Sequence, residues 1–152
     1  MLKKINQLNR QAWLRKTLAD LPAALRILDA GAGELQNLPH CQHLEYVSQD
    51  FCRYKGISGG APDEGSQMEN FDTSRIDLVS DITSIPAPDA SFDAILCVEV
   101  LEHVPEPTHA LEEFARLLKP GGKLILTAPF ACLVHMAPYL YCTGFSRYWY
   151  EH

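Results

Sequence analysis

The sequence lacks the features that mark several classes of protein. None of its apolar runs approaches the roughly 20 residues that cross a bilayer, and its charged N-terminus has no apolar stretch typical of a signal peptide. Its five cysteines are widely spaced without a CxxC pair, which favours reduced thiols. With 13 basic and 19 acidic residues, a net charge of −6 and no Lys/Arg cluster, a nucleic-acid backbone is an unsuitable partner. We therefore expect a cytoplasmic protein with no membrane or nucleic-acid partner.

The length of 152 residues suits one domain, which we expect to span 1–152. Residues 1–24 contain a predicted helix, with Leu14, Leu18 and Leu21 on one face. Residues 26–130 form the predicted core, and residues 131–152 form a tail rich in aromatic residues. An apolar fraction of 47% excludes global disorder.

Apolar runs and turn signals alternate along the core. Strands are predicted at residues 26–30, 44–48, 76–80, 93–98 and 123–128. A helix is predicted from Pro107, with its apolar residues at helical spacing, and the sequence Lys119-Pro120-Gly121-Gly122 ends it. Residues 54–70, rich in glycine, form a predicted loop and a candidate lid. Continuous apolar strands joined by crossovers predict an α/β fold with a doubly wound, mostly parallel sheet of about five strands.

Acidic residues and glycines stand at the ends of the first three predicted strands. Gly31 and Gly33 follow the first strand, where the missing Cβ atoms let the backbone approach a ligand. Asp50 follows Asp29 by about 20 residues, the offset at which an acidic residue binds ribose hydroxyls. Asp81 ends the third strand beside Ile82. Ligands of open α/β sheets bind at the carboxyl ends of strands, so the sequence predicts a nucleoside site.

The glycine turn differs from the phosphate-binding motifs. The dinucleotide fingerprint GxGxxG would need a glycine where Gln36 stands, and the phosphate loop GxxxxGK(S/T) does not occur. Glu34 would also repel a pyrophosphate. A ligand that carries an ammonium or sulfonium group suits this acidic lining better. A nicotinamide dehydrogenase is therefore disfavoured.

Several stretches together resemble a known family. They are LDAGAGE (28–34), the acidic residue Asp50, SDITSIP (80–86), SFDAILCVEVLEHVPEP (91–107) and LLKPGGKLILTAP (117–129). In this order and at this spacing, they resemble class I methyltransferases that depend on S-adenosylmethionine, in the branch that acts mainly on small molecules and lipids. The Asp/Asn-Pro-Pro-Tyr/Phe motif of enzymes that methylate amino groups and bases is replaced by Cys97-Val98-Glu99-Val100. The resemblance implies a Rossmann-like fold, S-adenosylmethionine as cofactor, S-adenosylhomocysteine as product and a small-molecule acceptor.

The resemblance also implies roles for individual residues. Gly31 and Gly33 would pass under the methionine part of the cofactor, and Asp29 would order that turn or meet the amino group. Asp50 would bind the ribose hydroxyls and Phe51 would pack near the adenine. Asp81 would bind the adenine amine and Ile82 its ring. Cys97, Val98 and Glu99 would border the methionine part and the entry of the substrate.

Methyl transfer from a sulfonium needs a general base only where the acceptor must lose a proton. Candidates near the end of the fourth strand are His103, Glu102 and Glu99, of which we name His103 as the catalytic residue. Residues 102–105 also make sense as a polar loop before a helix. Asp29 has a structural alternative too, because a carboxylate can cap a turn.

Two other groups of residues were weighed. The sequence His40-Cys41-Gln42-His43 is interpreted as a polar loop and no metal site is predicted, since zinc sites usually take four ligands in spaced pairs. The aromatic tail could line a substrate pocket or cover the sheet, and packing is the preferred interpretation. The tail residues are Tyr139, Tyr141, Phe145, Tyr148, Trp149 and Tyr150.

The chain departs from the family pattern in two ways. Leu35 replaces the third glycine of the first motif, and the sequence stops at His152, without the helix and antiparallel strands that family members place after the fifth strand. An uncovered sheet edge would need burial, for which another copy of the chain is the candidate. The alternative to a methyltransferase is a cofactor-binding fragment or pseudo-enzyme that acts as a binding or partner module without turnover.

Overall fold

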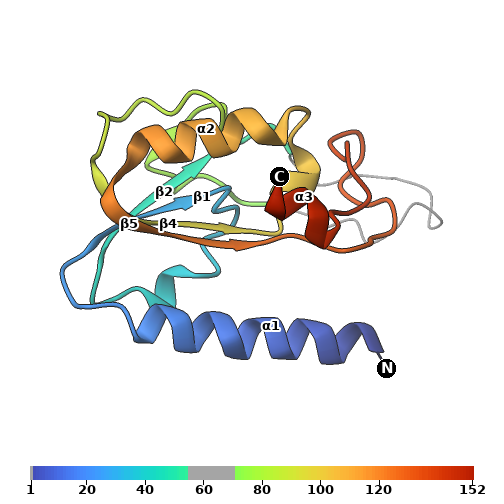
Figure 1. Ribbon diagram of the computed structural model, residues 1–152, viewed down its shortest axis with the longest axis horizontal. Helices are drawn as coiled ribbons and strands as arrows, with labels where there is room; N and C mark the ends of the chain where they lie inside the picture. The colour runs from blue at the N-terminus through green and yellow to red at the C-terminus, as the bar shows by residue number, and fades with distance from the viewer. Residues whose placement is uncertain (1, 55–70) are drawn as a thin grey trace.

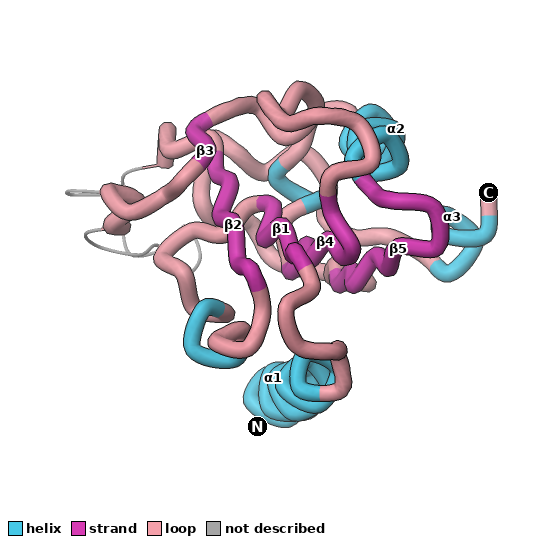
Figure 2. Tube along the Cα trace, turned by 90° about the vertical axis from the view of Figure 1, so that its left-hand side faces the viewer, coloured by secondary structure: helices cyan, strands magenta, loops and turns pink. Residues whose placement is uncertain are grey.

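A computed structural model describes residues 2–54 and 71–152 of the chain. Its sheet has five strands in the order β3-β2-β1-β4-β5, and every pairing is parallel. The strands are β1 (Arg26–Ala30), β2 (Glu45–Asp50), β3 (Leu78–Val79), β4 (Phe92–Val98) and β5 (Leu118–Thr127). Figure 2 shows them side by side in this order. The predicted parallel α/β sheet of about five strands is confirmed.

Two long helices cover opposite faces of the sheet (Figure 1). Helix α1 (Leu2–Ala19) lies on one face, where Leu14 and Leu18 are buried as predicted and Leu21 is buried just after the helix. Helix α2 (Pro107–Leu117) lies on the other face and starts at Pro107, whose fixed φ suits a first turn. A short helix, α3 (Arg147–Glu151), follows near the C-terminus. Among the described residues, no helix is both long and apolar enough to cross a membrane.

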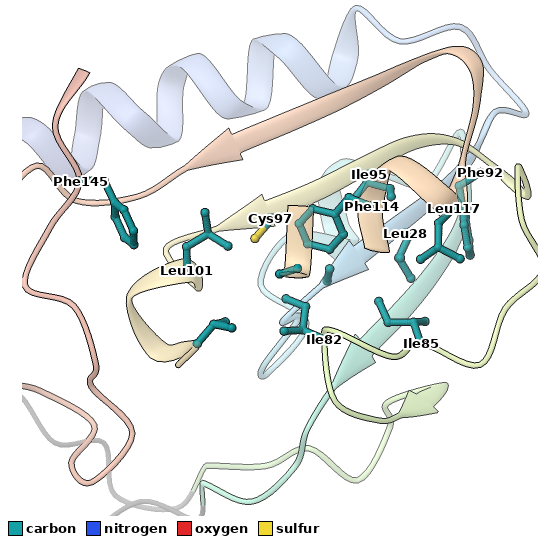
Figure 3. Close-up of a cluster of buried hydrophobic side chains, with 13 residues drawn as sticks. Leu28, Ile82, Ile85, Phe92, Ile95, Cys97, Leu101, Phe114, Leu117 and Phe145 are labelled. Atoms are coloured by element: carbon teal, nitrogen blue, oxygen red, sulfur yellow. The ribbon is translucent and has the colours of Figure 1, made fainter. Parts of the chain in front are cut away.

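The core between the sheet and α2 contains the apolar face of that helix. Phe114 and Leu117 pack with Leu28 and Ile95 of the sheet (Figure 3). Phe145 from the C-terminal segment joins the same cluster, with Trp149 against it. Packing, the preferred interpretation of the aromatic tail, therefore describes Phe145 and Trp149.

Three strand boundaries differ from the prediction. Strand β2 extends to Asp50, so Gln49 and Asp50 are its last two residues rather than the residues after it. Strand β3 contains two residues instead of five, because the Asp77 carboxylate accepts hydrogen bonds from the N–H and hydroxyl of Ser48 in place of a backbone ladder. Strand β5 begins at Leu118, so Lys119-Pro120-Gly121-Gly122, predicted to separate helix from strand, lies inside it. Its register with β4 shifts between Phe92 and Ala94.

The candidate lid at residues 54–70 falls almost wholly outside the described residues. Tyr54 is described and buried, and its ring contacts Phe71 edge-on, with ring centroids 5.3 Å apart. The lid stays a prediction.

Candidate functional site

A cavity of about 340 Å³ lies at the carboxyl ends of the strands. The strand order reverses between β1 and β4, and ligands of open α/β sheets bind at this switch point. Nine of the eleven residues that the sequence singled out line this cavity: Gly31, Gly33, Asp50, Phe51, Asp81, Ile82, Val98, Glu99 and His103. Positions scattered over more than 70 residues are thus brought to one place. Asp29 and Cys97 do not line it.

The turn after β1 needs glycine for two separate reasons. Gly31 has φ +77°, and a Cβ built there would lie 2.5 Å from a methyl carbon of Val100. The N–H groups of Gly31 and Ala32 both donate to the Gln49 carbonyl, at 2.8 and 2.9 Å. Leu35, which replaces the family's third glycine, also has a left-handed backbone, with φ +60°. The chain therefore keeps the glycine-like turn geometry at a position where it has a side chain.

Asp50 holds the loops on either side of it. One carboxylate oxygen accepts the N–H of Gly33 at 3.1 Å, and the other accepts the N–H of Cys52 at 2.8 Å. The residue is only 6% exposed, yet it lines the cavity. Each carboxylate oxygen can accept a second hydrogen bond, so the site retains acceptors for a diol.

Gln49 is a site residue that the sequence did not reveal. It lines the cavity and is 1% exposed. Its side-chain amide donates to the Ser80 carbonyl at 2.8 Å, and its side-chain oxygen lies 3.3 Å from the Gly31 nitrogen. It therefore ties the glycine turn to the end of β3. Its place beside Asp50 at a strand end was the only sequence signal.

Asp29 and Cys97 are buried behind the cavity lining. The Asp29 carboxylate accepts hydrogen bonds from the Tyr46 hydroxyl at 2.5 Å and from the Asn37 amide at 3.1 Å. Burial raises the pKa of Asp29 to about 6, although these two hydrogen bonds oppose the shift. Cys97 lies in the core next to α2, and burial raises the pKa of its thiol. Neither side chain lines the cavity, and the hydrogen bonds of Asp29 go to side chains rather than to the backbone of the glycine turn.

Asp81 and Ile82 form the wall after β3. The Asp81 carboxylate accepts hydrogen bonds from the N–H and the hydroxyl of Thr83, at 2.9 and 2.8 Å, which lower the pKa of Asp81. Ile82 is buried and joins the core. A carboxylate that can accept further hydrogen bonds thus stands next to an apolar side chain at the cavity wall.

The C-terminal segment supplies the opposite wall, which the sequence reasoning placed only in part. Met136, Tyr139 and Tyr141 line the cavity. The ring of Tyr139 contacts Phe51 edge-on, with centroids 5.1 Å apart. The pocket alternative for the aromatic tail therefore describes Tyr139 and Tyr141. No local signal in the sequence identified Met136.

Glu99 connects the cavity to helix α1. It follows β4 with a left-handed backbone, φ +54°, and its N–H donates to the Thr127 carbonyl at 2.9 Å. Its carboxylate forms an ion pair with Arg10 of α1 at 2.8 Å. Helix α1 thus contacts the cavity wall through Arg10.

His103 lies in a 3-10 turn, Leu101–His103, beside the cavity. Its Nδ1 lies 2.7 Å from the Tyr139 carbonyl oxygen, and its ring meets His135 edge-on with centroids 4.8 Å apart. Burial is the main cause of a lowered pKa at His103. The neighbouring Glu102 is 1% exposed, and burial raises its pKa to about 7.

In the described part of the chain, one group of side chains has donor atoms close enough for one metal ion. It consists of Glu102, His103 and His135, whose donor atoms lie within 4.8 Å of one another. This differs from the histidine and cysteine cluster at 40–43, where Cys41 is buried in the core and burial raises its pKa to about 12.

Known proteins share both the sequence pattern and this fold. The family model described as Methyltransferase domain matches residues 28–126. An enzyme of Xanthomonas oryzae pv. oryzae named Ubiquinone biosynthesis O-methyltransferase is 46% identical over 72 residues, covering 43% of this chain and 29% of the relative. A protein of the same name from Xylella fastidiosa is 48% identical over 54 residues, 35% of this chain and 21% of the relative. The chain thus spans less than a third of the length of these relatives.

Among solved structures, the YcgJ protein of Bacillus subtilis is 27% identical, with a TM-score of 0.58 over 79% of this chain and 50% of that chain. The [4+2]-cyclase SpnF is 28% identical, with a TM-score of 0.54 over 74% of this chain and 42% of that chain. The family match covers the strands that build the cavity, from β1 into β5. The chain therefore belongs to the class I S-adenosylmethionine-dependent methyltransferases.

Proposed function

We propose that the cavity binds S-adenosylmethionine and that the chain transfers its methyl group to a small-molecule acceptor. The observation that carries the proposal is that Asp50, Asp81, Glu99 and the glycine turn all line one cavity. The cofactor carries an ammonium and a sulfonium, which suit this acidic lining. Gly31 and Gly33 both line the cavity, and without Cβ atoms they let a ligand approach the backbone of the turn.

We assign the residues as follows. Gly31 and Gly33 lie under the methionine part, Asp50 binds the ribose hydroxyls and Phe51 packs near the adenine. Asp81 accepts from the adenine amine and Ile82 packs on its ring. Val98 and Glu99 border the methionine part. Asp29 and Cys97 support this wall from behind.

The cofactor supplies a methyl group that is already activated by its positive sulfur. The protein mainly has to align the acceptor with that methyl group, and such positioning can contribute roughly 7–11 kcal/mol. His103, at the cavity wall, is the candidate general base for an acceptor that must lose a proton. The name O-methyltransferase of the 46% identical relative makes an oxygen acceptor our first choice.

Two further parts of the proposal concern the location and the oligomeric state of the protein. The five cysteines are free thiols, which supports a cytoplasmic location.

Leu124 on β5 and Trp13 on α1 are exposed next to each other, beside the β5 edge of the sheet. A second copy of the chain remains the proposed cover of this β5 edge.

Calorimetry with S-adenosylmethionine, S-adenosylhomocysteine and NAD tests the proposal. We expect the first two to bind and NAD not to bind. Absence of binding by the first two would overturn the proposal. Binding without methyl transfer to any phenol or other small acceptor would favour the alternative, a cofactor-binding module without turnover.

A further inference from the structure

Asn37 lines the cavity but has no role in the assignments above. It stands at the N-cap position of a 3-10 turn, Leu38–His40, where an asparagine usually accepts a backbone N–H of the turn that it starts. Here its backbone is helical rather than extended, with φ −89° and ψ −19°, and its side chain makes no capping bond. Its Nδ2 donates instead to the Asp29 carboxylate, at 3.1 Å. The orientation of this side chain is therefore set by its partner in β1.

The carboxylate of Asp29 determines which end of the Asn37 amide faces it. Burial raises the pKa of Asp29 to about 6, so the group is ionised at pH 8. An ionised carboxylate can only accept hydrogen bonds, and the amide must therefore turn its NH2 group inward. Asp29 is 1% exposed and does not line the cavity, whereas Asn37 does. The amide oxygen Oδ1 is thus the end that remains for a ligand.

Within the described residues, no cation pairs with the buried carboxylate of Asp29. Its two donors, the Tyr46 hydroxyl and the Asn37 amide, are neutral, and both bind its Oδ2 atom. The charge of Asp50 also acts on Asp29 and has the same sign. In the protein interior such a charge is screened less than in water. A cation on the cavity side of Asn37 would therefore be stabilised by the amide oxygen and by the carboxylate behind it.

We propose that Asn37 binds the ammonium group of the methionine part through Oδ1, and that Asp29 is a positioning residue that holds the amide in this orientation. This inference rests on the proposed function and adds a binding residue to it. Asn37 follows the glycine turn that is assigned to the methionine part, and it lines the same cavity. Asp29 then acts on the ligand without touching it, which agrees with its burial behind the lining.

A purely structural role for Asn37 is the competing explanation. Its bond to Asp29 joins the segment after the glycine turn to β1, and this bond would then serve the fold alone. Such a role acts through the shape of the cavity, so its loss would weaken every ligand of the cavity equally. Loss of an ammonium contact would weaken only ligands that carry the amino group. Two ligands that differ in this group alone therefore separate the two explanations.

Calorimetry at pH 8 compares S-adenosylhomocysteine with its des-amino analogue, in which a hydrogen atom replaces the amino group. Asn37→Ala should bind S-adenosylhomocysteine about 10-fold more weakly than the wild type, as expected for one hydrogen bond to a charged group. It should bind the analogue with unchanged affinity. Asn9→Ala is the matched control, because Asn9 is exposed on α1, and it should change neither affinity. Equal losses for the two ligands in Asn37→Ala, or no loss for either, would overturn the proposal.

A double-mutant cycle tests whether Asp29 acts through Asn37. Asp29→Ala frees the amide and should weaken S-adenosylhomocysteine binding but not binding of the analogue. In the Asn37→Ala background the same substitution should cause little further loss, since the side chain that it positions is absent. Fully additive losses would show that the two residues act independently and would contradict the positioning role.

Asp29→Asn adds a conservative variant to this cycle. It keeps an acceptor oxygen for the Asn37 amide but lacks the charge, so its affinity for S-adenosylhomocysteine should lie between those of the wild type and Asp29→Ala. If Asp29→Ala does not fold, Asp29→Asn takes its place, with a smaller loss that is again confined to S-adenosylhomocysteine. A loss that is equal for both ligands, or no loss for either, would then count against the positioning role.

The wild type separates failure of this inference from failure of the proposed function. We expect it to bind both ligands, and the analogue at least 10-fold more weakly. If it binds neither ligand, the proposed function is wrong and this inference falls with it. If it binds both ligands equally well, the cavity still holds the adenosine part as proposed, and only the ammonium contact of Asn37 is wrong.

Discussion

The carboxylate of Asp50 accepts the backbone N–H of Gly33 at 3.1 Å, so the last residue of β2 fixes the turn that follows β1. Asp50 therefore has two tasks, to hold the turn and to bind the ribose proposed to lie beside it. Asp50→Ala removes both. Hydrogen bonds to a charged group contribute about 1.5–3 kcal/mol, which corresponds to a loss of roughly 10–100-fold in affinity.

Calorimetry with S-adenosylhomocysteine measures this loss. Asp50→Asn keeps an acceptor oxygen for the Gly33 N–H and should lose less affinity than Asp50→Ala. His103→Ala is the control and should leave cofactor affinity nearly unchanged. Wild-type affinity in Asp50→Ala would show that the ribose assignment is wrong.

Gly31→Ala should destabilise the protein more than Gly121→Ala. Both glycines have a left-handed backbone, with φ +77° and +78°, so the strain from the new side chain is the same, about 1–2 kcal/mol. A Cβ at Gly31 would in addition lie 2.5 Å from Val100, whereas nothing lies within 4 Å of one at Gly121. Overpacking adds about 1–3 kcal/mol. Urea unfolding of both variants measures the difference, and Val100→Ala in the Gly31→Ala background should recover part of it.

Tyr46→Phe should destabilise the protein more at pH 8 than at pH 5. The Tyr46 hydroxyl donates a hydrogen bond to the buried Asp29 carboxylate. Burial raises the pKa of Asp29 to about 6. Because that folded pKa lies above the usual value, ionised Asp29 disfavours folding as pH rises, and the tyrosine hydroxyl offsets part of this effect. Its loss costs about 1.5–3 kcal/mol where Asp29 is charged and less where Asp29 is protonated.

Thermal unfolding at the two pH values is the measurement for Tyr46→Phe. Tyr148→Phe is a suitable control, because Tyr148 is 78% exposed. It should change stability at neither pH. Equal destabilisation by Tyr46→Phe at pH 5 and pH 8 would speak against a charged Asp29 as the partner.

Arg116→Ala should lower the free energy of unfolding, because several partly buried hydrogen bonds are lost together. Arg116 on α2 donates to the Glu113 carboxylate and to the carbonyls of Ile85 and Ala87, and so joins the helix to the chain before β4. It is also the main cause of a lowered pKa at Glu113. That contribution is present above pH 4.5, the usual pKa, and is lost as pH falls through the lowered value.

Urea unfolding between pH 3 and pH 7 tests both statements about Arg116. Lys16→Ala breaks an exposed pair with Asp20 and should change the free energy of unfolding very little. If Arg116→Ala costs no more than this control, the network does not stabilise the fold. The acid part of the profile should be flatter in Arg116→Ala than in wild type.

The central strands were predictable because their signals are local. Strand β1 has the predicted bounds, since its apolar run is closed by Gly31. Strand β3 was predicted too long because a side chain, Asp77, makes bonds that a backbone ladder would make. The start of β5 was missed because Pro120 and Gly121 normally end regular structure, yet here they lie in an irregular part of the strand.

The site was predictable to the extent that strand ends define it. Asp50 and Asp81 line the cavity because parallel strands end at one edge of the sheet. The sequence could not separate lining from buried residues, so Asp29 and Cys97 were grouped with their neighbours. Met136 could not be placed, because it reaches the cavity through the fold of the C-terminal segment rather than through a strand end.

The strand order also determines when the protein can fold during synthesis. Strand β1 pairs with β2, which follows it closely, and with β4, which follows much later. The N–H of Arg26 donates to the carboxylate of Asp93, 67 positions further along the chain. At roughly 5–20 residues per second, a ribosome takes several seconds to supply that partner. During this interval one edge of the buried strand β1 has no partner, and this is the stage at which a nascent chain would most depend on a chaperone.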